Sequence, residues 1–366
     1  MVVRMQNKIL IIGPFPSPIS GVSIANEVMA KGLQRKNWNV DTINSEYSQK
    51  ITNKHGKISF RKLAFIKTYL LIYKLFFSKI IYITVGQSFY GVIKYSPFIL
   101  LAKLSNKVLV VHLHGNHLLK EYDTLKGIKK KVFGTLISMF DYGIVLSESL
   151  RPNFEPFFKK EHIFELHNFF EKTLSEPKEL LLRRKDYSEL RLVFLSNLME
   201  EKGINILLEA VKRLKDRGIH FQVKVAGHKI KENDVSNLLN GLDNVEYLGV
   251  VQGKQKKELL LWATVFCLPT FYKMEGQPIS ILEAMATGNL ILTTRHAGIT
   301  DVCKEENAVF CEKENVEDLE NKLELLFKDN NQIQQKGLLN IDYANEFFNE
   351  EKFIENANKI LLQCIN

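Results

Sequence analysis

The feature that most constrains the fold is a regular alternation of short apolar segments with amphipathic helical segments. This alternation is typical of parallel sheets covered by helices, and it occurs twice along the chain. The sequence therefore predicts an α/β protein built from two Rossmann-like domains. In the first half we expect strands at residues 8–12, 39–42, 80–84, 107–113, 142–146 and 162–166, and in the second half at residues 192–195, 222–226, 245–248, 265–268, 290–293 and 308–310.

A polar, charge-rich stretch at residues 169–189 has no strand pattern and separates the two halves. A chain of 366 residues has room for about two domains. We expect an N-terminal domain at residues 1–172 and a C-terminal domain at residues 173–345, followed by an amphipathic segment, residues 346–366, that can pack back on the first domain. Ligands of open α/β sheets bind at the carboxyl ends of the strands, so the chemistry is expected where the two domains face each other across a cleft.

The composition, with 45% hydrophobic and 25% charged residues, is that of an ordinary globular protein. Residues 13–16 interrupt the early apolar run at residues 9–12, which argues against a secretory signal. The longest apolar stretch, residues 63–85, contains three lysines, which argues against a membrane-spanning helix. The four cysteines have none of the spacings that metal or redox sites use. These observations predict a cytoplasmic protein with reduced thiols.

Positive charge is concentrated in one part of the first half. The formal net charge is +9, and no Asp or Glu occurs between Glu46 and Glu121, where twelve Lys and Arg residues lie. Such a region attracts anions. In a helix over residues 61–79, Lys67, Lys74 and Ser78 would form one narrow stripe among apolar and aromatic side chains. Two interpretations stay open: an anionic membrane surface, or the solvated stripe of a helix packed on a sheet. No nucleic-acid-binding motif accompanies the charge, so no nucleic acid partner is expected.

The segment from Glu275 to Glu283 is the most informative for function. It follows the expected strand at residues 265–268, and Pro278 is well placed as the first residue of a helix. The free backbone amides at such a helix start, with Gly276 allowing close approach, can bind phosphate oxygens. Two carboxylates beside a phosphate site can accept hydrogen bonds from sugar hydroxyls. This combination fits a nucleotide sugar.

The same segment resembles a known family motif. Glu, seven residues and Glu, with an internal Gly-x-Pro and a downstream Glu-Ala-Met-Ala-x-Gly, is similar to the donor-site motif of the family 4, or group 1, glycosyltransferases. These are retaining enzymes of the GT-B fold. The resemblance implies that Glu283 binds the ribose hydroxyls of the nucleotide. It also implies that Glu275 faces the hydroxyls of the donor hexose, together with the backbone near Gly276, Gln277, Pro278 and Ile279.

Two further loops resemble family elements. Residues 195–203 are similar to the strand-end Gly-Arg-Leu-x-x-x-Lys-Gly, which implies that Lys202 neutralises the donor diphosphate. Asn197 stands where Arg is usual, so the bidentate phosphate contact of Arg is missing, and either Lys202 carries more of the charge or another cation contributes. Residues 13–23 resemble the N-terminal glycine loop, which places Gly21 beneath the donor phosphates, although Val22 replaces the usual second glycine.

His112, His114 and His117 lie at the end of an expected strand. Strand alternation places His112 and His114 on one face without a nearby carboxylate or cysteine, and the chain has no Asp-x-Asp, so no metal site and no cofactor are expected. The resemblance implies that His114 contacts the donor sugar, and a buried core histidine is the alternative. His167 and Asn168 resemble a short turn that closes the first domain, which we interpret as structural.

The resemblance implies a retaining, metal-independent glycosyltransferase with Glu275, His114 and Lys202 in the catalytic centre. It would move a hexose from a nucleotide diphosphate sugar to a hydroxyl of a glycan acceptor. The basic region fits a polyprenyl-diphosphate-linked acceptor at the inner face of the cytoplasmic membrane. This predicts a role in the synthesis of capsule, of O-antigen and thus lipopolysaccharide, or of a related polysaccharide in a bacterium. The alternatives are a non-catalytic scaffold that binds sugar nucleotides, and a nucleotide-sugar epimerase or a phosphorylase of the same fold.

Overall fold

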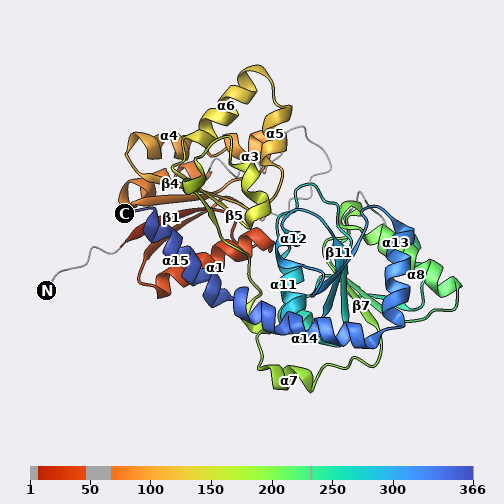
Figure 1. The fold of residues 1–366 in the computed structure, drawn as a ribbon. Coiled ribbons are helices and arrows are strands. Elements are labelled where there is room, and N and C mark those ends of the chain that lie inside the picture. The colour runs from red at the N-terminus through yellow and green to blue at the C-terminus, as the bar shows by residue number, and fades with distance from the viewer. Residues whose placement is uncertain (1–6, 47–66, 231–232, 234, 366) are drawn as a thin grey trace. The chain divides into compact units, whose positions relative to one another are not determined.

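The computed structural model describes residues 7–46, 67–230, 233 and 235–365. Its internal contacts divide the chain into two units, coloured red to yellow-green and green to blue in Figure 1, with the last helix added to the first unit. The first unit comprises Met1–His167 and Glu351–Asn366, and the second comprises Asn168–Glu350. The expected boundaries, after residue 172 and before residue 346, lie a few residues away from these.

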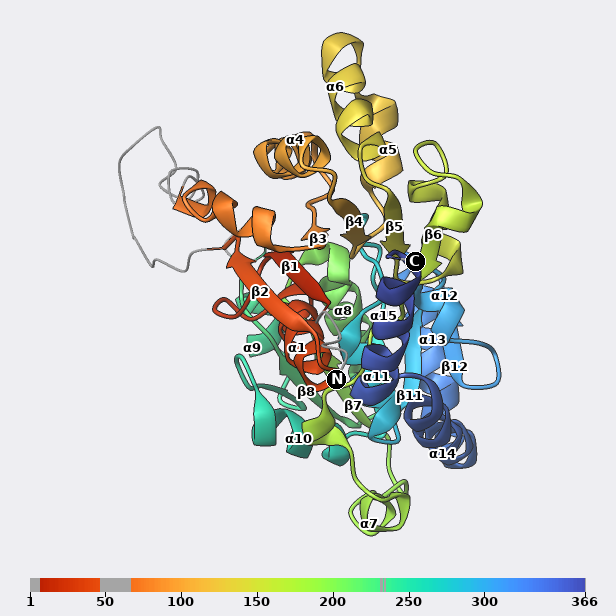
Figure 2. The same ribbon diagram turned by 90° about the vertical axis from the view of Figure 1, so that its left-hand side faces the viewer.

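The first unit is built on a parallel six-stranded sheet with the strand order β2-β1-β3-β4-β5-β6, which can be followed in Figure 2. Its middle strands are apolar on both faces because helices cover both faces. The side chains from Ile9 to Ile12, for example, are fully buried. The strands are β1 (Lys8–Gly13), β2 (Asn39–Asn44), β3 (Ile80–Thr84), β4 (Val108–Leu113), β5 (Tyr142–Val145) and β6 (Ile163–Glu165).

Helices cover both faces of this sheet. In Figure 1, α1 and α15 lie on one side of it and α4 and α6 on the other. The last helix packs closely on the first, because a Cβ atom on Gly32 would lie 2.4 Å from the side chain of Ile354. Trp38 also donates a hydrogen bond of 2.7 Å from Nε1 to Oδ1 of Asn358. The helices are α1 (Gly21–Arg35), α3 (Phe89–Ile93), α4 (Ser96–Leu104), α5 (Leu118–Thr124), α6 (Gly127–Ser138) and α15 (Glu350–Gln363), with 3₁₀ turns η1 (Ile72–Phe77), η2 (Glu148–Asn153) and η3 (Lys160–His162).

The α-helix expected over residues 61–79 is confirmed at residues 67–69 and is wrong for residues 70–79. Residues 61–66 lie outside the described residues, and Ile72–Phe77 form the 3₁₀ helix η1. Three residues per turn do not maintain the stripe of Lys67, Lys74 and Ser78, and Ser78 is buried. A short apolar pattern alone does not distinguish a period of 3.0 from one of 3.6.

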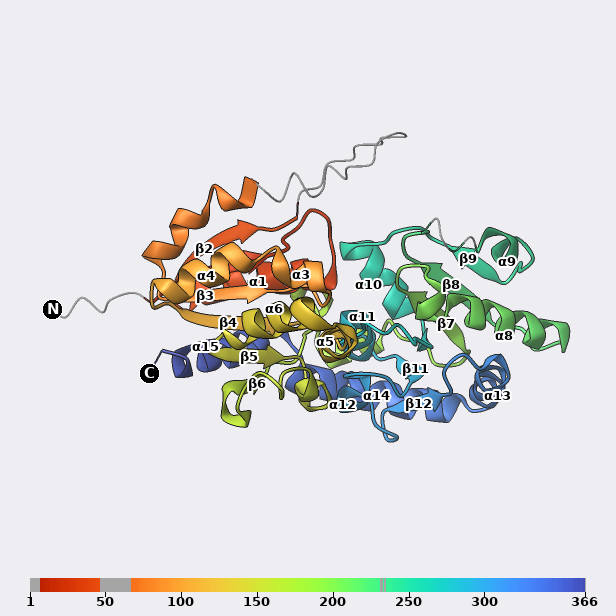
Figure 3. The ribbon, with the colours of Figure 1, turned by 90° about the horizontal axis from the view of Figure 1, so that it is seen from above.

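The second unit has another parallel six-stranded sheet, with the order β12-β11-β10-β7-β8-β9. Figure 3 labels its strands β7, β8, β9, β11 and β12. The strands are β7 (Arg191–Leu195), β8 (Gln222–Ala226), β9 (Val245–Tyr247), β10 (Val265–Leu268), β11 (Leu290–Thr294) and β12 (Ala308–Cys311). The crossover from β9 back to β10, next to β7, makes this a doubly wound sheet. All twelve strands lie within a few residues of their expected positions, which confirms the predicted α/β class.

Helices α8 and α13 cover one side of the second sheet, and α11 and α14 cover the other (Figure 1). In α8 the buried positions recur at helical spacing, as in Leu207, Leu208, Val211 and Leu214, which explains why this segment packs as a helix on the sheet. The helices are α7 (Lys178–Leu182), α8 (Ile204–Asp216), α9 (Ser236–Asn240), α10 (Gly253–Trp262), α11 (Ile279–Ala286), α12 (Ile299–Val302), α13 (Val316–Phe327) and α14 (Asn330–Phe347), with 3₁₀ turns η4 (Lys172–Leu174) and η5 (Glu200–Lys202).

Candidate functional site

The loops that follow β7, β8 and β10 meet at the carboxyl edge of the second sheet. Gly227 and Gly203 allow this meeting. A Cβ atom on Gly227 would lie 1.7 Å from the carbonyl oxygen of Ser196, and one on Gly203 would lie 2.3 Å from that of Pro269. Gly203 has φ +84°, a left-handed conformation that favours glycine. The backbones of the three loops are therefore in direct contact, at the edge where ligands of such sheets bind.

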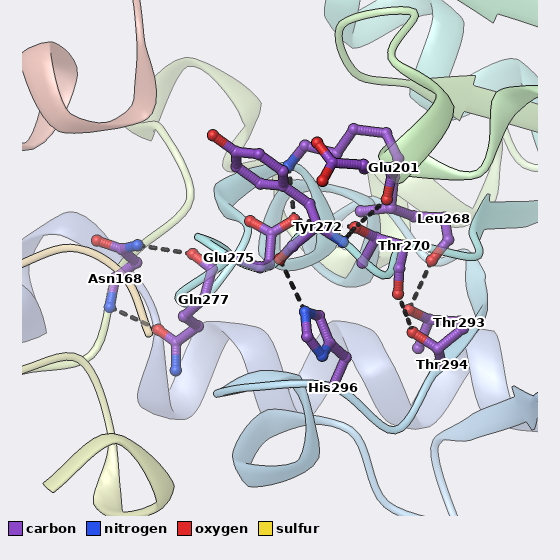
Figure 4. A network of polar contacts seen from close by, with 11 residues as sticks. Asn168, Glu201, Leu268, Thr270, Tyr272, Glu275, Gln277, Thr293, Thr294 and His296 are labelled. Carbon is purple, nitrogen blue, oxygen red and sulfur yellow. Dashed lines mark hydrogen bonds and ion pairs between the residues drawn. The ribbon is translucent and has the colours of Figure 1, made fainter. Parts of the chain in front are cut away.

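Lys202 and Glu275 form an ion pair in this region. The Nζ atom of Lys202 lies 2.5 Å from Oε2 of Glu275, and both side chains are largely buried. The hydroxyl of Thr270 lies 3.3 Å from the same carboxylate oxygen. The ammonium of Lys202 also lies over the ring of Tyr272, 4.9 Å from its centroid. Figure 4 shows Glu275 among the polar contacts of the loop after β10. The structure thus brings together two predicted site residues that are far apart in the sequence.

Backbone hydrogen bonds hold the loop after β10 in place. The amide of Phe271 donates to the carbonyl of Glu201 at 2.8 Å, and Thr270 Oγ1 donates to the same carbonyl at 3.2 Å. The ring of His296 contacts the carbonyl of Tyr272 through Nε2 at 2.8 Å (Figure 4). The loop that carries Glu275 is therefore fixed to the loop that carries Lys202.

The start of α11 differs slightly from expectation. Pro278 is the N-cap residue and Ile279 is the first helical residue, so the prediction that Pro278 begins the helix is wrong by one position. The first amides of a helix have no intrahelical partner, and no side chain caps this end. Gly276 accepts a hydrogen bond of 2.9 Å at its carbonyl from the amide of Gly298, and Gln277 is buried. The unsatisfied amides at Ile279 suit an anion.

Glu283 is buried in α11 and ion-paired. The Nζ atom of Lys256, on α10, lies 2.6 Å from Oε1 of Glu283 and also contacts the carboxylate of Glu171. Burial raises the pKa of Glu283 to about 7, Lys256 opposes this rise, and Glu171 adds to it. Sequence analysis missed Lys256 and Glu171, because nothing in their local sequence marks them.

Asn197 follows β7 and is exposed. Its carbonyl accepts a hydrogen bond of 2.8 Å from the amide of Met199, and the next residue, Leu198, pairs with Lys229 of the loop after β8. The ammonium of Lys229 lies over the ring of Tyr247, 4.7 Å from its centroid. The loop after β8 therefore provides a second lysine close in the fold to the position where Arg is usual.

The first unit contains the remaining two predicted residues. His114 follows β4, and its ring centroid lies 4.0 Å from that of His112, whose Nδ1 is hydrogen-bonded to the hydroxyl of Tyr82. Burial lowers the pKa of His114 to about 3, so its imidazole is neutral at physiological pH. The Nε2 atom of His114 is buried and has no hydrogen-bond partner among the described residues. The hydrogen-bonding capacity of this nitrogen is therefore not used by the described residues.

Gly21 begins α1, next to a capping box. The amide of Ser23 donates to Oγ of Ser20 at 3.1 Å, and the amide of Ser20 donates to Oγ of Ser23 at 2.8 Å. Part of the anion-binding capacity of this helix start is therefore already used by its own side chains. Over the described residues, no group of three or more His, Cys, Asp or Glu side chains is arranged to hold a metal ion.

Residues 189–329, which contain Lys202, Glu275 and Glu283, match the family model of the group 1 glycosyl transferases. The second unit is a group 1 glycosyltransferase domain. The segment from Glu275 to Glu283 therefore lies within the matched residues.

Three curated relatives are similar to part of this chain. WcaL of Escherichia coli K12, a glycosyltransferase named for colanic acid biosynthesis, is 30% identical over 34% of this chain and 33% of its own length. The amylovoran biosynthesis glycosyltransferase AmsK of Erwinia amylovora is 28% identical over 35% and 33%. The N,N'-diacetylbacillosaminyl-diphospho-undecaprenol alpha-1,3-N-acetylgalactosaminyltransferase of Campylobacter jejuni is 30% identical over 42% and 40%. The similarity thus spans a third to two fifths of these relatives.

Solved structures share the fold over nearly the whole chain. Sucrose-phosphate synthase from Thermosynechococcus elongatus has a TM-score of 0.76 at 15% identity, covering 98% of this chain and 99% of that one. Anabaena HepE, solved in complex with UDP-glucose, has a TM-score of 0.72 at 12% identity, covering 97% and 99%. The two α/β units are those of the GT-B fold. None of the helices in the described residues is long and apolar enough to cross a bilayer.

Proposed function

We propose that the protein is a retaining glycosyltransferase that moves a hexose from a nucleotide diphosphate sugar to a hydroxyl of a glycan acceptor. One observation carries the proposal: Glu275, Glu283, Lys202 and the uncapped start of α11 come together at the carboxyl edge of one sheet. Two carboxylates that accept hydroxyl hydrogen bonds, on either side of a region that attracts phosphate, match the two ends of such a donor.

Each residue has a distinct part in this proposal. Glu283 accepts hydrogen bonds from the ribose hydroxyls, and Glu275 accepts them from the hexose. Gly276, Gln277, Pro278 and Ile279 provide the backbone around the hexose and the phosphates. The ammonium of Lys202 has three donors, of which one serves Glu275, so two remain for diphosphate oxygens. Asn197, in place of an Arg, gives the phosphates a weaker contact, and Lys229 is the candidate for the missing cation.

The reaction needs no metal or cofactor in this account. The bond between the anomeric carbon and the β-phosphate oxygen breaks, and the acceptor oxygen bonds to the same face of that carbon. The acceptor proton passes to the departing diphosphate. Lys202 and the amides of α11 stabilise the charge that develops on the leaving group, which is the kind of contribution that lowers a barrier most.

The roles of Gly21 and His114 rest on the family resemblance. Gly21 would lie beneath the donor phosphates, and His114 would contact the donor sugar through its unpartnered Nε2. A neutral imidazole can donate or accept a single hydrogen bond there without adding charge.

The acceptor in this proposal is a polyprenyl-diphosphate-linked glycan of a bacterial surface polysaccharide. The Campylobacter relative is named for a diphospho-undecaprenol acceptor, and two other relatives are named for colanic acid biosynthesis and amylovoran biosynthesis. The acid-free, lysine-rich part of the first unit suits the diphosphate of such a lipid.

A cytoplasmic enzyme with this acceptor would work at the inner face of the membrane. The surface around η1 supports such contact, because Tyr73, Phe76 and Phe77 are exposed beside Lys67 and Lys79. Phe76→Ser/Phe77→Ser should reduce cosedimentation with vesicles that contain phosphatidylglycerol, and Leu325→Ser, an exposed leucine of the second unit, should not. Equal binding of all three proteins, or equal binding to phosphatidylcholine vesicles, would contradict a specific anionic surface.

The direct test of transfer is the product. The protein is incubated with UDP-, GDP-, ADP- and dTDP-sugars and a polyprenyl-diphosphate-linked glycan, and the anomeric configuration of the new linkage is determined by NMR. Retention of the donor configuration is expected. Inversion would overturn the mechanism, and nucleotide binding without product would favour the alternative of a non-catalytic scaffold, which Asn197 keeps open.

A further inference from the structure

We propose that the first residues of the second unit, Asn168 to Glu171, belong to the donor site. They position the segment from Glu275 to Glu283 near both of its ends. This opening segment holds the loop at Gln277 through Asn168 and the carboxylate of Glu283 through Glu171 and Lys256. The inference rests on the proposed function, because it assigns Asn168, Glu171 and Lys256 as positioning residues for the proposed donor.

Asn168 is hydrogen-bonded twice to Gln277. The backbone amide of Asn168 donates to Oε1 of Gln277 at 2.7 Å, and the side-chain Nδ2 of Asn168 donates to the backbone carbonyl of Gln277 at 2.7 Å. Both residues are buried, at 5% and 3% exposed, and Figure 4 shows the two side chains reaching toward each other beside Glu275. Buried reciprocal bonds of this kind define one orientation of the peptide group between Gln277 and Pro278.

That peptide group sets the direction in which α11 begins. The carbonyl of Gln277 is bonded to Asn168, and the preceding carbonyl of Gly276 is bonded to Gly298 at 2.9 Å. Because both carbonyls are hydrogen-bonded within the protein, the backbone enters α11 in one orientation. The same bonds therefore fix the direction of the uncapped amides at the start of α11. Asn168 therefore acts on the part of the motif proposed to contact the hexose and the phosphates.

Glu171 acts at the other end of the motif. Lys256 contacts both Glu171 and Glu283, so its single positive charge is divided between two carboxylates. Lys256 and Glu171 are the two charged groups that act on Glu283. Without Glu171, Lys256 would pair with Glu283 alone and would compete more strongly with ribose hydroxyls. Glu171 thus keeps the carboxylate of Glu283 available to a ligand.

The opening segment is itself anchored, as a positioning element must be. The side chains of Phe169 and Phe170 are buried, and the amide of Phe170 donates to the carbonyl of Phe348 at 2.8 Å. Asn168 and Glu171, on either side of this anchor, therefore have fixed backbone positions.

The test compares Asn168→Ala and Glu171→Gln with matched controls in the full-length protein. Asn330→Ala removes a similar amide bond, 2.6 Å to the carbonyl of Ser188, at the start of α14. Glu176→Gln removes an ion pair of 3.0 Å with Lys257, which directly follows Lys256 in the sequence. Calorimetry measures the Kd of UDP-glucose, UDP and UMP, with GDP-mannose, GDP and GMP beside them, and circular dichroism checks that each variant is folded.

The two variants should differ in which ligands they bind less tightly. Asn168→Ala should raise the Kd of the nucleotide sugar about tenfold, as expected for a lost buried hydrogen bond. The Kd of the monophosphate should stay within about twofold of the wild-type value. Glu171→Gln should weaken all three ligands of the series and shift the acid midpoint of binding to lower pH, because the pKa of Glu283 falls when a neighbouring negative charge is removed. Both controls should behave as the wild type.

Equal losses across all ligands in both variants, or losses in the controls of the same size, would overturn the inference. So would wild-type affinities in Asn168→Ala and Glu171→Gln, while the proposed function would stand. If the wild type itself binds none of these ligands and none of the ADP-, dTDP- and CMP-sugars, the proposed function fails and this inference fails with it.

Discussion

The ammonium of Lys202 lies 2.5 Å from a carboxylate oxygen of Glu275, so the cation and the anion of the candidate site neutralise each other. Each side chain is largely buried, and a buried charge that loses its partner is strongly destabilised. A donor that binds here must therefore share the pair, with phosphate oxygens on Lys202 and sugar hydroxyls on Glu275. The ion pair therefore holds the two side chains together before the donor arrives.

Glu275→Gln should abolish most of the transfer. The substitution keeps the shape of the side chain but removes the charge that holds Lys202 and that, in this account, accepts hydrogen bonds from the hexose hydroxyls. We expect kcat to fall at least about a hundredfold, which is typical for loss of one preorganised polar group. Steady-state measurement of nucleoside diphosphate release gives kcat and KM, and Glu258→Gln, an exposed acid paired with Arg184, serves as control. A variant of Glu275 with wild-type turnover would remove this residue from the catalytic centre.

Nucleotide affinity should depend on pH through Glu283. Burial raises the pKa of Glu283 to about 7, and the ionised form is the one that accepts hydrogen bonds from ribose hydroxyls. Affinity should therefore be highest above pH 7 and fall as the pH decreases below it. Titration of the binding nucleotide from pH 5.5 to 8.5 measures this, and Glu283→Gln should bind weakly with a flat profile. A flat profile in the wild type would contradict the assignment.

Lys256→Met should shift the same profile in the opposite direction to Glu171→Gln. Without the ammonium 2.6 Å away, the pKa of Glu283 rises further, so the acid midpoint moves to higher pH. Lys256→Arg keeps the charge and should restore most of the affinity at pH 7.5. An unchanged midpoint in Lys256→Met would show that the lysine does not control Glu283.

Gly203→Ala should destabilise the second unit and displace Lys202. The left-handed φ of +84° costs about 1–2 kcal/mol for any other residue, and the new Cβ would lie 2.3 Å from the carbonyl of Pro269. Gly218→Ala is the matched control, because Gly218 has φ +80° and open space around it. Urea unfolding should show that Gly203→Ala is at least about 1 kcal/mol less stable than Gly218→Ala. Equal stability of the two variants would mean that the loops can separate.

His114 should act as a neutral group. Burial lowers the pKa of His114 to about 3, so its protonation state does not change between pH 5 and pH 8. His114→Asn should lower kcat/KM and leave the acid limb of the pH–rate profile in place. Loss of that limb in the variant would show that His114 itself titrates in the working range.

Sequence patterns predict most of this fold because its strands are buried on both faces. Runs such as residues 9–12 and 265–268 are apolar throughout. The spacing between successive runs along the chain leaves room for a crossover helix. The described part of the segment at residues 61–79 could not be predicted in the same way. Its lysines fit a helical stripe, but residues 72–77 form the 3₁₀ helix η1, which contacts β1 and α4, and these contacts are not visible in the local pattern.

The candidate site divides in a similar way. Glu275, Glu283 and the helix start between them lie within nine residues, so their spacing alone predicts this part of the site. The residues that contact them cannot be predicted in this way. Lys256 lies 27 residues from Glu283 and 85 from Glu171, and Asn168 lies 109 residues from Gln277. These contacts arise only when the sheet brings its loops together, and a lone lysine or asparagine has no local pattern that indicates such a partner.

The most direct test of the central claim is thermal unfolding in the presence of UDP, GDP, ADP, dTDP and CMP and their sugars. A ligand that binds only the folded state stabilises it by about 2.7 kcal/mol at a hundredfold excess over Kd, which raises Tm. The account predicts a rise with one nucleotide and its sugar, and loss of that rise in Glu283→Ala. No rise with any nucleotide, or an undiminished rise in Glu283→Ala, would contradict it.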